Sequence, residues 1–303
     1  MRGIGLKIAS VVVFIVMASL IKATADAVPP GEAVFFRSLF AIPVIIVWLL
    51  VRGELMTGLR TPNPTGHLWR GLVGTAAMGL GFAGLGLLPL PEVTAIGYAA
   101  PLLVVVFAAM FLGEEVRLFR LSAVFLGLAG VIIVLSPRLT ALQGEADPVA
   151  AFGAMVVLSG AICTALAQVF VRKLVRTEST SSIVFWFSFT ASVLALCTLP
   201  FGWRMPGPVD ALMLVTAGLL GGVGQILLTS SYRWADVGVI APFEYASILF
   251  ALLIGYVVFG EVPTGTMLGG ASLVILAGVF IIWRERQLGL ERAAQRRAMP
   301  PGG

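Results

Sequence analysis

The chain has little of what enzymes and disulfide-linked proteins use. Its 303 residues include one histidine, His67, and two cysteines, Cys163 and Cys197. His67 has no Cys, Asp or Glu at the spacing of metal ligands, and a nucleophilic enzyme would need a base as well as a nucleophile. This scarcity argues against an enzyme, a metal site or a cofactor. We expect the two cysteines to pack as small apolar groups rather than to form a disulfide.

Charged residues are also scarce, at 12% of the chain against roughly a quarter in soluble proteins. The mean hydropathy is correspondingly high, at +1.02. Apolar stretches of about 20 residues, the length that crosses a bilayer, recur along the whole chain and leave no room for a soluble domain. The sequence therefore predicts an integral membrane protein.

The apolar stretches have the character of helices. They are continuous and rich in Leu, Ala and Gly, whereas the strands of a membrane barrel alternate over about ten residues. In lipid, only a helix or a closed barrel satisfies its own backbone amides. We predict an all-α protein with ten transmembrane helices, at residues 4–24, 31–51, 67–88, 93–112, 119–136, 149–171, 181–201, 209–231, 237–259 and 264–283.

The second half of the chain repeats the first. Residues 97–101, Gly-Tyr-Ala-Ala-Pro, begin an apolar run that ends in Gly-Glu at 113–114. Residues 244–248, Glu-Tyr-Ala-Ser-Ile, begin a run that ends in Gly-Glu at 260–261. Each half holds five spans, and an odd number of spans makes the second half enter the membrane inverted relative to the first. Inverted repeats of this kind supply alternating access to a central cavity between them.

The repeats also set the predicted domain boundaries. We predict a first five-helix repeat at 1–138, a linker at 139–148, a second five-helix repeat at 149–283 and a basic cytoplasmic tail at 284–303. The first stretch also resembles a secretory signal, because basic residues precede it and Ala23-Thr24-Ala25 follows. We interpret it as a helix, since its removal would unbalance the two halves.

The basic residues predict the orientation in the membrane. With the N-terminus in the cytoplasm, nearly all Lys and Arg residues, Lys7 and Arg70 included, fall in cytoplasmic loops and tails. The exceptions are Lys22, Arg37, Arg138 and Arg204. Cytoplasmic loops carry such an excess, so both termini are predicted to be cytoplasmic. The sequence pI of about 9.7 then reflects topology and attraction to anionic lipids rather than nucleic-acid binding.

Several short motifs occur in a characteristic order. Pro30-Gly31-Glu32 is followed by Arg37 early in the second span, Gly-Glu closes the fourth and ninth spans, and the glycine-rich tenth span ends in Ala-Gly-Val-Phe-Ile-Ile at 277–282. This pattern resembles the EamA family of the drug/metabolite transporter superfamily over residues 4–283. The resemblance implies a ten-helix, inverted-repeat bundle with a central cavity that moves small metabolites, often amino acids, across the inner membrane of bacteria.

The resemblance also sets the expected function. Within the superfamily we compare the chain first with the YddG-like amino-acid exporters, although no motif separates these from vitamin, S-adenosylmethionine or sugar-phosphate carriers. We expect a secondary transporter that exports amino acids by alternating access, with an uptake carrier for S-adenosylmethionine or riboflavin as the alternative. A channel would need polar rings in a homo-oligomer, which the internal duplication does not favour. Monomer and homodimer both stay open.

Ionisable and aromatic residues inside the spans are the candidates for substrate contact. A charge in the bilayer costs roughly 2.5 to 3.5 kcal/mol on insertion scales, so it should face a partner or a wet cavity. Glu244 follows Pro242, whose ring removes a backbone hydrogen bond, and it suits an amine-bearing substrate or a proton. A structural contact with Arg233 or with a Tyr hydroxyl is the alternative. Tyr98 and Tyr245 occupy equivalent places in the two halves and are expected to line one pocket from opposite helices.

Other residues in the spans are further candidates. Trp186 is expected to wall the cavity, while Gln168 and Gln225 suit hydrogen bonds between helices as well as substrate contact. Pro101 in the fourth span and Pro242 in the ninth are the predicted helix-breaking positions. They do not occupy equivalent places in the two halves, so the breaks need not be symmetric.

Charges gather at the outer ends of the first two spans. They are Lys22, Asp26, Glu32 and Arg37. We expect a salt-bridge cluster that fixes the first hairpin, with a gate that breaks and reforms as the alternative. Glu114 and Glu261 each follow Gly at a helix end, and we interpret both as loop or cap residues.

Overall fold

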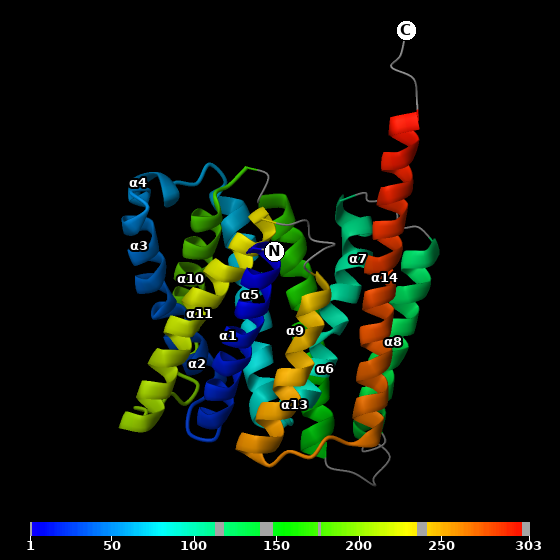
Figure 1. Cartoon of the computed structure of the whole chain (residues 1–303). Helices are drawn as coiled ribbons and strands as arrows, with labels where there is room; N and C mark the ends of the chain where they lie inside the picture. The colour runs from blue at the N-terminus through cyan, green and yellow to red at the C-terminus, as the bar shows by residue number, and fades with distance from the viewer. Residues whose placement is uncertain (1, 113–117, 140–147, 175–176, 235–240, 299–303) are drawn as a thin grey trace.

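The computed structural model describes residues 2–112, 118–139, 148–174, 177–234 and 241–298, and this part of the chain is a bundle of helices (Figure 1). The helices are α1 (Arg2–Thr24), α2 (Pro30–Leu39), α3 (Ala41–Val51), α4 (Leu55–Gly58), α5 (Pro64–Leu87), α6 (Leu90–Gly97), α7 (Ala99–Leu112), α8 (Leu118–Leu139), α9 (Pro148–Leu174), α10 (Thr180–Leu196), α11 (Pro208–Trp234), η2 (Ala241–Tyr245), α13 (Ala246–Phe259) and α14 (Gly265–Ala298). The predicted all-α membrane fold is confirmed, whereas the number of spans and their inverted arrangement stay predictions.

The described helices have the lengths and apolarity that membranes require. Six helical stretches are long and apolar enough to cross a bilayer, with α2–α3 and α6–α7 each counting as one stretch. Four shorter apolar helices accompany them. We call the end of the bundle where α1, α5 and α10 begin the N-terminal face, and the end where α1 stops and α6 begins the far face; they are the top and bottom of Figure 1.

Two predicted spans are broken in the middle rather than continuous. The second span is split at Phe40, between α2 and α3, and the fourth is split at Tyr98, between α6 and α7. Pro43 and Pro101 explain the breaks, because each ring lacks the N–H that would bond to the carbonyl four residues earlier. Phe40 (φ −78°, ψ −8°) and Tyr98 (φ −67°, ψ −6°) keep helical dihedral angles, so the chain bends without turning back.

The ninth and tenth spans also differ from the predicted helices. The ninth changes its helix type, and the tenth is longer than predicted. In the described part, the ninth begins as the 3₁₀ helix η2, which contains Pro242, and changes to an α-helix after Tyr245. Residues 237–240 of that span lie outside the described residues. Helix α14 continues to Ala298, far beyond the predicted end at 283, and projects from the bundle (Figure 1). Most of the predicted linker at 139–148 likewise lies outside the described residues.

The helices of the two halves pair with each other. Helix α1 packs against α11, α5 against α9, and α8 against α14. Helix α2 packs against α10, and α6 against α13. The helices α1, α5, α9 and α11 are the first, third, sixth and eighth spans. If each span corresponds to the span five places later, the α1–α11 contact is equivalent to the α9–α5 contact. Each of the other three contacts joins two spans that correspond to each other. A two-fold relation between the halves predicts this set of contacts.

Candidate functional site

An ion pair joins α1 to the start of the ninth span. Lys7 Nζ lies 3.3 Å from Glu244 Oε2, and the two side chains are 3% and 44% exposed. Lys7 is therefore buried within α1 rather than in a tail, whereas its predicted cytoplasmic side stays a prediction. The side chain of Arg233, the predicted alternative partner of Glu244, lies outside the described residues. The sequence did hold a signal for this ion pair, because Lys7 lies within the predicted span at 4–24 and a lysine buried in a span needs an anion.

Tyr98 and Tyr245 lie together, as their equivalent positions in the two halves predict. Their ring centroids are 5.1 Å apart and the rings meet at 66°. The Tyr98 hydroxyl lies 3.2 Å from the Tyr245 carbonyl oxygen and 2.6 Å from Ser247 Oγ, and it accepts a hydrogen bond from the Ile248 amide at 3.0 Å. The change of helix type at Tyr245 disturbs the backbone bonding of the ninth span, and the hydroxyl bonds to backbone groups there.

The tyrosine pair is packed as part of the protein core. Tyr98 and Tyr245 are 4% and 8% exposed. Gly278 of α14 makes room for the second ring, because a side chain there would overlap the Tyr245 hydroxyl. The pair therefore links α6, η2, α13 and α14 at the point where two spans are broken. Substrate contact by these residues stays a prediction.

A second ion pair joins α1 to the other end of the ninth span, at the far face. Lys22 Nζ lies 2.9 Å from Glu261 Oε1, and both side chains are mostly buried. Lys22 also donates to the carbonyl oxygens of Leu85 and Leu88, where α5 ends, and Glu261 Oε2 accepts from the Leu90 amide, where α6 begins. A cation at a helix C-terminus and an anion at a helix N-terminus are each stabilised by the helix dipole.

The Gly-Glu motif explains how Glu261 reaches this position. Gly260 has φ +66°, a conformation that glycine adopts without strain, and the Glu261 amide bonds to the Gly255 carbonyl at 2.8 Å, which closes the end of α13. The carboxylate then caps α6 of the other half, so the predicted cap role of Glu261 is confirmed with a different helix. Glu114, its predicted equivalent, lies outside the described residues.

The predicted salt-bridge cluster of the first hairpin is wrong. Lys22 pairs with Glu261 rather than with Asp26 or Glu32, and Glu32 Oε2 accepts a hydrogen bond from the Arg204 amide at 3.2 Å. Arg37 is buried, with its guanidinium group over the ring of Phe187. Sequence proximity misled the prediction, because the true partner of Lys22 belongs to the second half of the chain.

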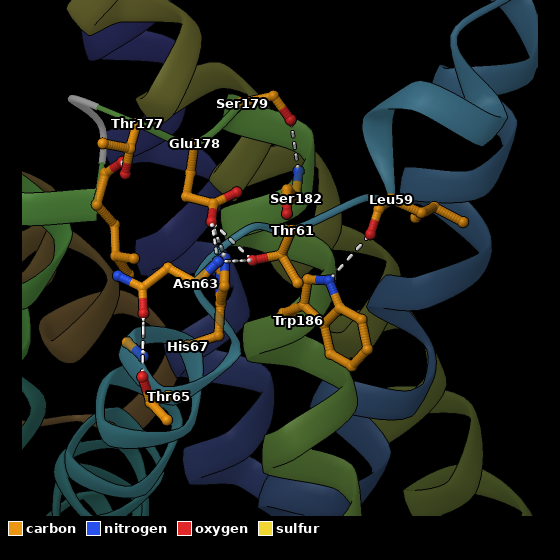
Figure 2. A network of polar contacts seen from close by, with 12 residues as sticks. Leu59, Thr61, Asn63, Thr65, His67, Thr177, Glu178, Ser179, Ser182 and Trp186 are labelled. Carbon is orange, nitrogen blue, oxygen red and sulfur yellow. Dashed lines mark hydrogen bonds and ion pairs between the residues drawn. The ribbon is translucent and has the colours of Figure 1, made fainter.

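A polar network at the N-terminal face ties the second half to the first (Figure 2). Glu178, whose side chain is 1% exposed, accepts hydrogen bonds from Thr61 Oγ1 at 2.6 Å and the Asn63 amide at 3.1 Å. His67 Nε2 lies 3.5 Å from Glu178 Oε1, an electrostatic approach without the geometry of a hydrogen bond. Asn63 Oδ1 caps α5 through the Gly66 amide. Sequence reasoning missed this network.

The remaining predicted residues have separate surroundings in the described part. Trp186 Nε1 donates to the Leu59 carbonyl at 3.0 Å, which holds the end of α4 (Figure 2). Gln168 and Gln225 are half-buried, and no side-chain hydrogen bond of either is found in the described part. Pro101 lies in the first turn of α7. The binding roles of these residues stay predictions.

Two of the pockets in the described part have linings that do not include the tyrosine pair. One, of about 230 Å³, lies near the far face between α1, α2 and α5, with Ile21, Phe82 and Gly86 in its wall. The other, of about 210 Å³, lies at the N-terminal face between α3, α10 and α11, with Trp48 and Trp234 in its wall. The predicted central cavity stays a prediction.

Comparisons with known proteins agree with this architecture. The model of the EamA-like transporter family matches residues 1–136 and 151–284. The S-adenosylmethionine uptake transporter of Rickettsia bellii is 26% identical over 256 residues, which are 84% of each chain. The pseudopaline exporter of Pseudomonas aeruginosa is 26% identical over 91% of this chain and 94% of that protein. A crystal structure with a TM-score of 0.67 covers 94% of this chain and 98% of its own, at 24% identity, and shows the likeness of fold.

Proposed function

Because the chain belongs to the EamA-like transporter family, and is thus a multi-pass membrane transporter of small molecules, we propose that it exports amino acids across the bacterial inner membrane by alternating access. The observation that carries this proposal is the pair of salt bridges between α1 and the ninth span. Lys7–Glu244 lies toward the N-terminal face and Lys22–Glu261 at the far face. Each pair closes one end of a path between the two halves, and transport requires that they open in turn.

Glu244 is the residue that meets the substrate in this proposal. Its side chain is 44% exposed although its partner Lys7 is buried, so the carboxylate is the more accessible member of the pair. The ammonium group of an amino acid offers the same charge as Lys7 and replaces it at Glu244. The exchange releases α1 from η2, where Pro242 already prevents a continuous α-helix.

The other predicted residues serve the same path. The rings of Tyr98 and Tyr245 separate when the broken fourth and ninth spans bend, and they then line the space that opens. Trp186, Gln168 and Gln225 contact the substrate as it passes. Helix breaks in transporters are the places where such bending and substrate contact occur.

Uptake of S-adenosylmethionine or riboflavin is the second candidate function. The relatives carry the names of an uptake transporter and of an exporter, so similarity supports both directions. Amino acids and S-adenosylmethionine both present an ammonium group for Glu244, whereas riboflavin presents none. The Lys7–Glu244 pair therefore favours the first two over riboflavin.

Counterflow in proteoliposomes tests the proposed function. Vesicles loaded with one amino acid are expected to accumulate the same labelled amino acid, with S-adenosylmethionine and riboflavin assayed in parallel. Glu244→Gln is expected to lose this exchange while it folds and purifies normally. Tyr245→Ala is expected to lose it as well, with lower stability because it truncates a buried ring. Glu54→Gln is the matched control, because Glu54 is an exposed residue paired with Arg52. Unchanged exchange in both site variants would remove the assignment.

A further inference from the structure

Two arginines of the described part are buried and belong to none of the ion pairs found there. Arg37 of α2 and Arg70 of α5 are 3% and 8% exposed. None of the ion pairs found among the described residues includes either of them. Arg70 was predicted to lie in a cytoplasmic loop, and the structure places it within α5 instead, while the side of the membrane stays a prediction. A buried charge without a partner is strongly unfavourable, so an anion is expected here.

The two guanidinium groups converge on one aromatic ring. Arg37 Cζ lies 5.8 Å and Arg70 Cζ 3.7 Å from the ring centroid of Phe187, on α10. Helices α2, α5 and α10 pack against one another. The ring offsets part of each charge through a cation–π interaction but accepts no conventional hydrogen bond. Nε and Nη1 of both arginines are buried without a hydrogen-bond partner in the described part.

Among the described residues, the buried side-chain polar groups without a partner lie in these same three helices. Every buried side-chain nitrogen or oxygen without a hydrogen-bond partner in the described part belongs to α2, α5 or α10. Besides the arginines, they include the hydroxyls of Ser38, Thr75 and Ser188. Proteins leave few such groups unpaired, so their concentration here indicates a place that a polar ligand completes.

Glycines leave room for the guanidinium groups. A Cβ atom at Gly221 of α11 would lie 2.9 Å from Arg37 Nε, and one at Gly74 would overlap Arg70 Nη1. The space around both groups is therefore kept free of side chains on the neighbouring backbone. No carboxylate of the described part forms an ion pair in that space.

We propose that Arg37 and Arg70 form an oxyanion site that takes the carboxylate of the transported substrate. The identity of the substrate rests on the proposed function, whereas the site itself does not. A guanidinium group presents a planar fork of donors that matches the two oxygens of a carboxylate or phosphate, and its charge does not titrate away. Amino acids and S-adenosylmethionine carry a carboxylate and riboflavin does not. A lipid phosphate offers the same chemistry from a second source.

The oxyanion site and Glu244 lie beside different parts of α1. Arg37 and Met17 of α1 both lie against Gly221, whereas Glu244 pairs with Lys7, ten residues earlier on α1. A helix rises about 1.5 Å per residue, so roughly 15 Å along α1 separates the two places. In this proposal the ammonium group of a small amino acid meets Glu244 first, and its carboxylate then meets the arginines.

Thermal unfolding of the purified full-length protein in detergent tests the site without transport. Dilute sodium phosphate, below the concentrations at which it stabilises proteins generally by exclusion from their surface, is expected to raise the unfolding temperature of the wild type above that in sodium chloride of equal ionic strength. Arg37→Met and Arg70→Met are expected to lose this gain, while Arg52→Met, which changes an exposed arginine, keeps it. In chloride the two site variants are expected to unfold no earlier than the wild type, since they remove an unpaired buried charge.

Binding of matched ligands then identifies the source of the oxyanion. L-Methionine is expected to bind the wild type at least tenfold more tightly than L-methioninamide, which lacks the carboxylate, and the site variants are expected to bind the two alike. Phosphate stabilisation that survives in both variants, or earlier unfolding of both in chloride, would overturn the site. Stabilisation by added phosphatidylglycerol but by no soluble oxyanion would overturn its assignment to the substrate. Arginine-dependent phosphate stabilisation without amino-acid exchange would reject the proposed function and leave the oxyanion site standing.

Discussion

The two ion pairs of α1 differ in how far their carboxylates are exposed. At the far face, Lys22 and Glu261 are 14% and 15% exposed, lie 2.9 Å apart and also bond to the backbone at the end of α5 and the start of α6. At the other end, Lys7 and Glu244 lie 3.3 Å apart, and the carboxylate is 44% exposed. The carboxylate at the far face is therefore largely buried, while the carboxylate toward the N-terminal face is half-exposed.

The largest expected difference between the two ends is in stability. Lys22→Met leaves Glu261 largely buried without its cation and leaves the Leu85 and Leu88 carbonyls without a donor, so the free energy of unfolding is expected to fall by about 3 kcal/mol. Lys7→Met leaves Glu244 half-exposed to water, and the expected loss is about 1 kcal/mol or less. Unfolding in detergent monitored by circular dichroism checks both values. Equal losses would remove the distinction between the pairs.

The tyrosines between the two ends offer a second comparison. Tyr98→Phe removes the hydroxyl that bonds to Ser247 and to the Ile248 amide, and it is expected to cost about 2 kcal/mol in unfolding free energy. Tyr245→Phe is expected to cost less than about 0.5 kcal/mol, because no hydrogen bond of its hydroxyl is found in the described part. The same unfolding assay measures both variants, and a larger loss for Tyr245→Phe would contradict the role given to Tyr98.

A smaller effect is expected on substrate affinity. Lys7→Met removes the cation that competes with the substrate for Glu244, so an amino acid is expected to bind about tenfold more tightly, which corresponds to about 1.4 kcal/mol. Exchange in proteoliposomes is expected to slow in the same variant, because the N-terminal end no longer closes on Lys7. Isothermal titration calorimetry gives the affinity. Weaker binding together with normal exchange would show that Lys7 does not compete with substrate.

The smallest expected effect concerns the polar network in Figure 2. Trp186→Phe removes the hydrogen bond to the Leu59 carbonyl and is expected to cost about 1 kcal/mol in unfolding free energy. Phe185→Leu, a change of a neighbouring ring on α10, serves as the matched control for altered packing. If Trp186→Phe lost exchange at unchanged stability, Trp186 would act in the transport path rather than in fixing the end of α4.

The internal repeat predicted one contact between distant segments, whereas proline predicted only one of the two helix breaks. The meeting of Tyr98 and Tyr245 followed from the internal repeat, because equivalent positions in two related halves lie near the axis that relates them. The break at Tyr98 follows from Pro101, yet the similar break at Phe40 went unpredicted although Pro43 has the same effect.

The partner of Lys22 and the burial of Arg70 show why other contacts could not be predicted from the sequence. Lys22 has Asp26 and Glu32 close by in sequence, and nothing local indicates that Glu261 is its partner. Arg70 was placed in a cytoplasmic loop because basic residues usually mark such loops. Its burial over Phe187 depends on the packing of α5 against α10, which periodicity alone does not specify.

Distances between spin labels at the two ends of α1 and the ninth span test the central claim most directly. After replacement of Cys163 and Cys197, one label pair at Asp26 and Val262 reports on the far face, and a second pair at Gly5 and Phe243 reports on the end toward the N-terminal face. Added amino acid is expected to change the two distances in opposite directions: as the distance at one end of the bundle lengthens, the distance at the other end shortens. Distances that lengthen together, or that do not respond to any substrate that the protein exchanges, would contradict alternating access through these two ion pairs.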